Sequence, residues 1–334
     1  MLQDPDAADS EDSLNMLPKS YITIRSAQMR AVLRVQAEIC AAIRDCLSEQ
    51  GFLELLPPIV GPVTDPGIRG ARQASIDFYG HEYKVMSSAI LYKQMAVSAL
   101  GKVYFFSPNV RLEPLETVGT RRHLCEFVQV DVEEPFATYR DAMSVAEQLL
   151  RGVCRRIVEA CEDQLKELGR NLRVPTAPFK RLPHRRAVEM LRARGYSLSW
   201  DAEIPWREEA ALSEMFEEPF FVIDYPKGAR GFYDKEDLER PGTLRDFDLL
   251  YPEGYGEAAS GAEREHELEK VLGRMKQNGE DPARYGWYVD MLRYGVLPSA
   301  GFGIGIERLT RYVCGLEAVW EARPFPKVAG IPSP

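Results

Sequence analysis

The chain has 334 residues, 45% of them hydrophobic, and a formal net charge of -9. This acidic balance argues against a protein whose main task is to grip a nucleic-acid backbone, and no apolar run reaches the roughly 18 residues of a membrane span. The six cysteines show no Cys-x-x-Cys spacing and the four histidines are far apart, so we expect reduced thiols in a cytoplasmic protein and no zinc site.

The first 18 residues are acidic and hold little apolar content. We predict a short disordered tail over residues 1–18, which lacks the basic start and apolar core of a signal peptide. Residues 26–51 predict a long helix, because apolar residues recur at helical spacing and Gly51 stands at a stop position. The run 52–56 predicts a short strand that ends at Pro57-Pro58. This helix–strand unit fits either plain packing or a subunit interface.

Residues 82–86 and 103–107 predict strands with a helix over 91–100 between them, and a hairpin candidate follows. Its strands would be 110–113 and 127–133. In the second strand one face is aliphatic, with Val128, Val130 and Val132. The opposite face of the hairpin collects Arg111, Glu113, Phe127, Gln129, Asp131 and Glu133. A solvated sheet face is common for such alternation, yet a phenylalanine among facing cations and anions favours a binding site.

The rest of the chain mixes helices with strands. Residues 138–169 predict a long amphipathic helix with a solvated charged face. Further helices are predicted near 187–194 and 208–216, and a strand at 220–225. Helices over 263–278 and 285–294 precede a glycine-rich strand. Strands dominate the candidate site and helices flank them, which indicates an α+β fold with an antiparallel β-sheet flanked by helices.

The glycine-rich stretch 301–308, Gly-Phe-Gly-Ile-Gly-Ile-Glu-Arg, is the most informative part of the sequence. Its glycines alternate with large apolar residues, which is the two-residue period of a strand. One face would enter a core through Phe302, Ile304 and Ile306, while the other is bare and lets a ligand lie against the backbone. Arg308, at the start of a predicted helix, suits a nucleotide phosphate or a purine ring.

Other interpretations of this stretch compete with a ligand site. Its Gly-x-Gly-x-Gly spacing lies inside a strand and differs from the Gly-x-Gly-x-x-Gly that opens a helix in dinucleotide-binding folds. A P-loop needs Gly-Lys-Ser/Thr, which the sequence does not contain. A close-packed structural glycine strand remains open as an alternative.

Three segments, taken in order, resemble the signature motifs of class II aminoacyl-tRNA synthetases. They are Gly51–Pro58, then Val110–Glu113 with Thr120–Phe127, then Gly301–Leu309. Gly256–Arg264 and Tyr294–Gly303 narrow the resemblance to the aspartyl/asparaginyl subgroup, and the likeness runs from about residue 20 to residue 330. It implies a class II catalytic domain over residues 19–334 and a homodimer built through the first motif.

Synthetases of this subgroup carry an N-terminal β-barrel that reads the anticodon, whereas the first-motif helix here begins at residue 26. A bare catalytic domain of this kind is similar to the archaeal-type asparagine synthetases, and Ser299-Ala300 also resembles that amidating branch. We therefore expect ATP-dependent amidation of aspartate by ammonia through a β-aspartyl-adenylate, with release of AMP and pyrophosphate. No tRNA partner and no membrane are expected.

The resemblance also implies roles for single residues toward ATP. Arg111 would bind the α-phosphate, where charge builds as pyrophosphate leaves. Phe127 and Arg308 would lie on the two faces of adenine, and Glu113 would accept a hydrogen bond from its amino group. Arg111 and Arg308 would be the catalytic cations. The other ATP contacts would come from His123, Arg121 or Arg122, Glu257, Gly303 and Gly305.

The metal and the amino acid have their own implied positions. Mg²⁺ prefers oxygen ligands, and the matching positions are Glu257, Ser260 and Asp248. Lys93 and Arg264 would pair with the two carboxylates of aspartate. Gln129 and Asp131 would hold its ammonium group.

Some positions depart from the synthetase pattern. Ile90 replaces a substrate-contacting glutamine, and Trp320 and Lys327 stand where arginines are usual. Two alternatives therefore stay open. One is an adenylate-forming amide ligase or an aminoacylating paralogue that acts on another amino acid, a carrier or tRNA. The other is a non-catalytic regulatory paralogue, although such paralogues usually lose the motif arginines that are present here as Arg111 and Arg308.

Overall fold

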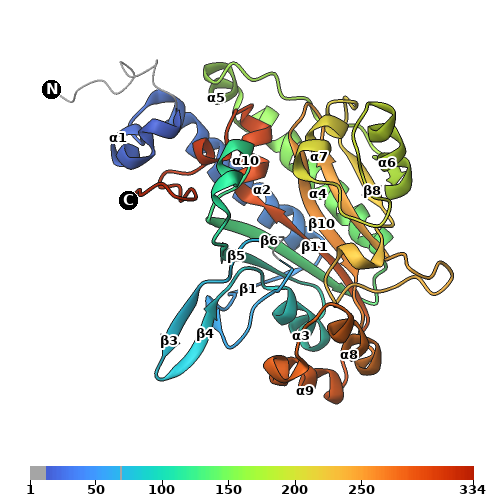
Figure 1. Ribbon diagram of the computed structural model, residues 1–334. Helices are drawn as coiled ribbons and strands as arrows, with labels where there is room; N and C mark the ends of the chain where they lie inside the picture. The colour runs from blue at the N-terminus through green and yellow to red at the C-terminus, as the bar shows by residue number, and fades with distance from the viewer. Residues whose placement is uncertain (1–12, 68–69) are drawn as a thin grey trace.

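The computed structural model describes residues 13–67 and 70–334, and an eight-stranded sheet forms its centre (Figure 1). The spatial order of the strands is β1 (Leu53–Leu55), β5 (Val103–Val110), β6 (Glu126–Pro135), β11 (Ser299–Gly305), β10 (Gly256–Glu263), β9 (Asp246–Tyr251), β8 (Phe220–Ile223) and β7 (Lys180–Pro183). The central pairs are antiparallel and the two edge pairs, β1–β5 and β7–β8, are parallel. The predicted α+β fold with a mainly antiparallel sheet is thus confirmed.

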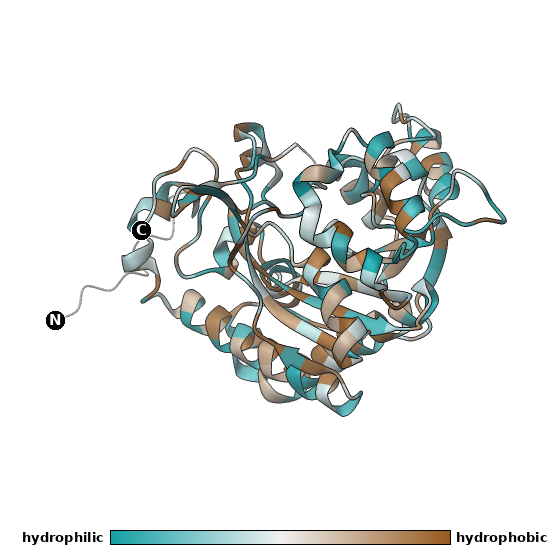
Figure 2. Cartoon of the chain, turned by 90° about the horizontal axis from the view of Figure 1, so that it is seen from below, coloured by the Kyte–Doolittle hydropathy of each residue, from teal (hydrophilic) through white to brown (hydrophobic). Residues whose placement is uncertain are grey.

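The main hydrophobic core joins the sheet to three helices, α2 (Ala27–Glu49), α4 (Tyr139–Ala160) and α10 (Ile306–Cys314). Each of the two long helices has a side-chain cap. The hydroxyl of Ser26 accepts from the backbone N–H of Met29, and Thr138 forms a capping box with Asp141. In Figure 2 hydrophobic and hydrophilic residues alternate along the helices beside the sheet, as expected for helices with one buried side.

The opposite face of the sheet carries shorter helices. They are α3 (Ile90–Leu100), α6 (His184–Ala193), α7 (Trp206–Ser213), α8 (Leu268–Gln277) and α9 (Gly286–Tyr294). A second sheet, ordered β2 (Val60–Gly61), β4 (His81–Val85), β3 (Ser75–Phe78), projects from the body (Figure 1). Short 3-10 turns complete the chain at η3 (Leu115–Thr120), η4 (Lys227–Ala229), η5 (Pro282–Tyr285) and η6 (Val319–Ala322).

Several predicted boundaries were wrong. The hairpin partner of β6 is β5, so Arg111 and Glu113 lie just beyond a strand end. The helix predicted over 138–169 breaks at Cys161, after which α5 (Glu162–Glu167) turns to pack its buried Leu165 into the main core. Glu263 ends β10 and does not begin a helix, because its backbone N–H donates to Arg245 in the strand region.

The prediction of a disordered tail is wrong for residues 13–18, which are ordered. Residues 1–12 lie outside the described residues, whereas Ser13–Lys19 form the 3-10 helix η2, followed by α1 (Ser20–Thr23). Leu17 is buried in a small cluster with Leu124 and Trp320, and the indole N–H of Trp320 donates to the Ser13 hydroxyl. Apolar burial and one hydrogen bond therefore order this segment. Among the helices of the described ranges, none has the length and apolar content needed to cross a bilayer.

Candidate active site

The glycine strand β11 lies between β6 and β10, and its two ends differ in how closely they are packed. A methyl group on Gly301 would lie 2.0 Å from the carbonyl oxygen of Val132 and 2.1 Å from the carboxylate of Glu133. At this end the bare face is therefore filled by the protein itself. On Gly305 the same methyl group would meet nothing nearer than 3.9 Å, the side chain of Arg308. The structural interpretation therefore holds at Gly301, whereas Gly305 has the open space that the ligand-binding interpretation requires.

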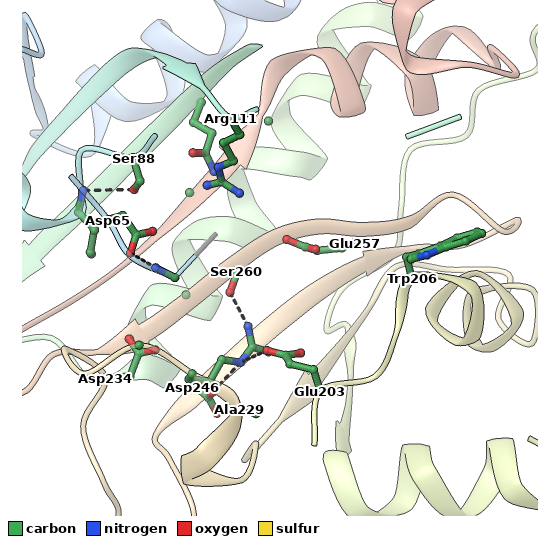
Figure 3. A pocket seen from close by; sticks show the side chains of 18 of the residues that line it. Asp65, Ser88, Arg111, Glu203, Trp206, Ala229, Asp234, Asp246, Glu257 and Ser260 are labelled. Carbon is green, nitrogen blue, oxygen red and sulfur yellow. Dashed lines mark hydrogen bonds and ion pairs between the residues drawn. The ribbon is translucent and has the colours of Figure 1, made fainter. Parts of the chain in front are cut away.

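A cavity of about 850 Å³ opens over the second half of this strand. That volume suits a small-molecule ligand bound with a cofactor. Most of the sequence-predicted site residues line it: Lys93, Arg111, Glu113, Arg122, His123, Phe127, Gln129, Asp131, Glu257, Ser260, Arg264, Gly303, Gly305 and Arg308. Figure 3 shows Arg111, Glu257 and Ser260 around the same space, with Trp206 at one end.

Two arginines, Arg111 and Arg308, line the cavity. Arg111 donates through Nε and Nη2 to the carbonyl oxygen of Ser87, both at 3.1 Å, and its guanidinium carbon is 5.2 Å from the centre of the Phe127 ring. Arg308 lies 3.3 Å from the Glu257 carboxylate. These contacts hold Arg111 beside a flat aromatic ring and Arg308 beside a carboxylate, and two cations with an aromatic ring suit a phosphate and a purine.

The three residues predicted to reach the outer phosphates differ in their surroundings. Arg121, which has a positive φ of 55°, forms an exposed ion pair with Glu317 and is not among the residues that line the cavity. Arg122 is buried, 2.8 Å from Glu209 and 3.6 Å from Glu257. The structure therefore directs one arginine of the pair into the cavity and the other to the surface.

His123 lines the cavity as a neutral group. It shares a 2.6 Å hydrogen bond with the Thr120 hydroxyl. Burial lowers its pKa to about 2, and repulsion from Arg308 and Arg122 adds to this. His184, in α6, has its pKa lowered to about 4, again mainly by burial. Neither imidazole is expected to carry charge near neutral pH.

These two histidines predict a pH dependence of stability. In the unfolded chain a histidine gains a proton below about pH 6.5, whereas the folded protein keeps both rings neutral. The unfolded state then binds more protons than the folded state. The contribution of these histidines to the free energy of unfolding is therefore fully present above about pH 6.5. Below that pH it falls by about 1.4 kcal/mol per histidine for each pH unit. Urea unfolding compared between about pH 7 and pH 5 measures the loss.

The matched variants are His184→Gln and His81→Gln. The first keeps a side-chain donor for the carbonyl oxygen of Ala202, which the His184 ring contacts at 3.0 Å, but cannot titrate. It should reduce the difference between the two pH values. The second alters an exposed residue of β4 and should leave that difference unchanged. Equal pH dependence in the wild type and in His184→Gln would contradict the assignment.

The other end of the cavity is a buried ionic cluster. Lys93 Nζ lies 3.4 Å from Asp131 and 3.5 Å from Glu133, and donates to the carbonyl oxygen of Phe302 at 3.1 Å. Arg264 pairs with Glu133 at 3.1 Å and with Asp234 at 3.0 Å. Burial raises the pKa of Asp131 and of Asp234, and the neighbouring cations oppose that rise.

The predicted magnesium positions do not form a metal cage. Asp248 and Ser260 both contact the guanidinium of Arg230, at 2.6 and 3.0 Å, and Glu257 faces Arg122 and Arg308. Across residues 13–67 and 70–334, no group of three or more His, Cys, Asp or Glu side chains is placed to hold a metal ion. Asp248 is also not among the residues that line the cavity. The side chains as they stand therefore do not fit a protein-held Mg²⁺ at these three positions.

Sequence reasoning missed several charged residues of the site. Asp234 and Arg230 come from the stretch 224–245, where no periodicity marks a buried residue. Glu209 reaches Arg122 from a helix 87 residues further along the chain. Glu133 was predicted on the polar face of the hairpin but received no role, although its alternation with Gln129 and Asp131 already placed it there.

Comparison with known proteins places this geometry in a family. The sequence model of the tRNA synthetases class II (D, K and N) matches residues 13–329. The asparagine–tRNA ligase of Pelotomaculum thermopropionicum is 35% identical over 313 residues, which are 93% of this chain and 72% of that protein. The asparagine–tRNA ligase of Thermococcus kodakarensis is 34% identical over 327 residues, which are 97% of this chain and 74% of that protein.

Solved structures agree with these relatives. Asparaginyl-tRNA synthetase from Pyrococcus horikoshii, complexed with asparaginyl-adenylate, matches with a TM-score of 0.92 and 32% identity over 100% of this chain and 76% of that one. Aspartyl-tRNA synthetase from Entamoeba histolytica matches with a TM-score of 0.83 and 27% identity over 97% of this chain and 64% of that one.

These relatives contradict two predictions from the sequence. Amidation of aspartate by ammonia was the wrong expectation, because the relatives are asparagine–tRNA ligases, and the exclusion of a tRNA partner was wrong for the same reason. The expectation rested on the early start of the first helix and on Ser299. Neither feature tests which nucleophile reacts with the adenylate. The Ser299 hydroxyl in fact donates to the buried Glu133 at 2.8 Å.

Proposed function

The chain belongs to the class II tRNA synthetases of the D, K and N group, and from this premise we propose that it activates asparagine with ATP and transfers it to tRNA. The observation that carries the proposal is the match, over the whole chain, to an asparaginyl-tRNA synthetase complexed with its adenylate. The cavity supports it, since arginines and a phenylalanine lie at one end and an ionic cluster at the other.

The proposed chemistry needs little from the protein beyond positioning and charge. The α-carboxylate of the amino acid attacks the α-phosphorus of ATP, an O–P bond forms and the bond to pyrophosphate breaks. A carboxylate is already ionised at neutral pH, so no base is required. Arg111 and Arg308 would stabilise the added charge on the phosphate. A hydroxyl of tRNA then attacks the carbonyl carbon and AMP leaves.

Charge in the buried cluster favours asparagine over aspartate. Lys93 already contacts the carboxylates of Asp131 and Glu133. Arg264 already contacts those of Glu133 and Asp234. The ammonium group of the substrate could pair with Asp131. The side-chain carboxylate of aspartate, which asparagine lacks, would be a fourth anion beside only two cations. Placing like charges together costs several kcal/mol. We therefore expect kcat/KM for asparagine to exceed that for aspartate by about 100-fold or more.

The test is ATP–pyrophosphate exchange with purified protein and MgATP, run separately with asparagine, aspartate, and aspartate plus ammonium. Asparagine-dependent exchange, followed by attachment of labelled asparagine to tRNA, is the expected result. Exchange that responds only to aspartate would overturn the amino-acid assignment. Exchange with asparagine but no charging of tRNA would overturn the transfer step, and no exchange with either amino acid would overturn the enzymatic role.

A homodimer remains a prediction, and the first-motif region supports it. Leu53, Leu56 and Ile59 are 49%, 94% and 61% exposed around the edge strand β1, an apolar group that association would cover. Light scattering should give twice the chain mass, 75.6 kDa from two copies of 37.8 kDa. Leu56→Asp should shift the protein toward a monomer, and a monomeric wild type would contradict the prediction.

A further inference from the structure

A buried guanidinium lies where the family resemblance implies a metal ion. The side chain of Arg230, directly after η4, is only 7% exposed. Its Nη2 donates to Asp248 Oδ2 at 2.6 Å and its Nη1 to Ser260 Oγ at 3.0 Å. These are two of the three positions implied for Mg²⁺. A cation that belongs to the chain therefore already contacts them.

Further groups surround the same guanidinium. Its Nε is 3.0 Å from Glu203 Oε1 and 3.4 Å from Asp246 Oδ2, and its central carbon is 3.9 Å from the centre of the Tyr225 ring. Figure 3 shows Glu203, Asp246 and Ser260 gathered at one side of the cavity. Side chains from strands β9 and β10 and from the loops that hold Glu203 and Tyr225 therefore all contact the guanidinium of Arg230.

An arginine is chemically suited to this position. Its planar guanidinium carries five N–H donors, keeps its charge at every physiological pH, and is weakly hydrated, so it enters a buried site more readily than a strongly hydrated ion. Mg²⁺ demands near-octahedral oxygen ligands and gives up water reluctantly. Buried carboxylates need a cation close by, and here one residue supplies it to three of them.

We propose that Arg230 is a built-in cation that takes the place of a divalent ion between Asp248 and Ser260 and holds both side chains in position. This inference rests on the proposed function, since it concerns the cavity that would bind ATP. A divalent ion would enter that cavity only together with the ATP phosphates, on the side of Glu257. Arg230 is a positioning residue in this scheme and does not contact the reacting atoms.

The experiment measures Mn²⁺ binding in the absence of ATP and amino acid, with free Mn²⁺ followed by electron paramagnetic resonance. The wild type should show no site tighter than about 1 mM, the weak end of protein cation sites. Arg230→Ala should gain one Mn²⁺ per chain, bound about tenfold tighter or better, because Glu203, Asp246 and Asp248 lose their cation. Its melting temperature should rise with added Mn²⁺.

Two further variants distinguish a cation site from a general loosening of the fold. Arg230→Ala with Asp248→Asn should lose the gained ion, and Arg230→Lys, which keeps the charge, should not gain it. A wild-type Mn²⁺ site that disappears in Asp248→Asn would overturn the proposal, as would a folded Arg230→Ala protein that binds no additional ion. If Arg230→Ala does not fold, the wild type and Arg230→Lys still test the proposal, because an Mn²⁺ site in either protein that Asp248→Asn removes would contradict it. Since no step of the assay involves catalysis, its result is independent of whether the proposed function holds.

Discussion

Replacing Arg111 with alanine should lower kcat/KM for asparagine-dependent pyrophosphate exchange by about 1,000-fold, equivalent to about 4 kcal/mol. The guanidinium is held by two hydrogen bonds to the Ser87 carbonyl oxygen and lies over Phe127, so it is fixed before substrate arrives. A preorganised cation stabilises charge that develops on the α-phosphate more than charge in the ground state. The loss should therefore appear mainly in kcat.

Two variants serve as controls for this result. Arg186→Ala removes an exposed arginine of α6 that pairs with Glu189 at 2.8 Å, and it should leave exchange unchanged. Arg111→Lys keeps the charge but cannot form the forked contact to Ser87, so an intermediate loss is expected. Circular dichroism and thermal melting must show that Arg111→Ala is folded. Retention of more than about a tenth of wild-type kcat/KM in a folded protein would remove Arg111 from its proposed role.

Gly301→Ala should destabilise the protein by more than about 4 kcal/mol, enough to prevent folding in many domains of this kind. The added methyl group would lie 2.0 Å from the carbonyl oxygen of Val132, which is backbone of the adjacent strand β6. It would also displace the carboxylate of Glu133 from Lys93 and Arg264. Two central strands would have to separate, and expression with urea unfolding measures the outcome.

Gly305→Ala is the matched substitution in the same strand. Its methyl group has 3.9 Å of space and the backbone φ of -77° accommodates alanine, so the protein should fold with near wild-type stability. The methyl group would project toward the cavity and should raise KM for ATP by about tenfold, the effect of one misplaced carbon in a tight site. If the Gly301→Ala and Gly305→Ala proteins were equally stable, the short distance between Gly301 and the Val132 carbonyl oxygen would not determine which residue the strand tolerates.

Prediction from sequence succeeded where residues near one another in the chain decide the outcome. The periodicity of 26–51 predicted α2, which spans Ala27–Glu49, and the alternation after Phe127 predicted a polar face on β6. It failed where distant residues decide. Arg230 contacts Ser260, 30 residues away, and Asp248, 18 residues away. No local pattern in the sequence marks that meeting point.

The sequence by itself determined the α+β fold, the family, and a set of site residues most of which line the cavity, because hydrophobic period and motif spacing are properties of neighbouring residues. Only the tertiary structure decided which charges neutralise one another. The register that sets Gly303 opposite Asp131 and Gly301 opposite Glu133 brings these carboxylates to Lys93 and Arg264. The fold also brings Arg230 between Asp248 and Ser260. Electrostatic pairing depends on distance in space and on burial, and neither quantity can be read from spacing along the chain.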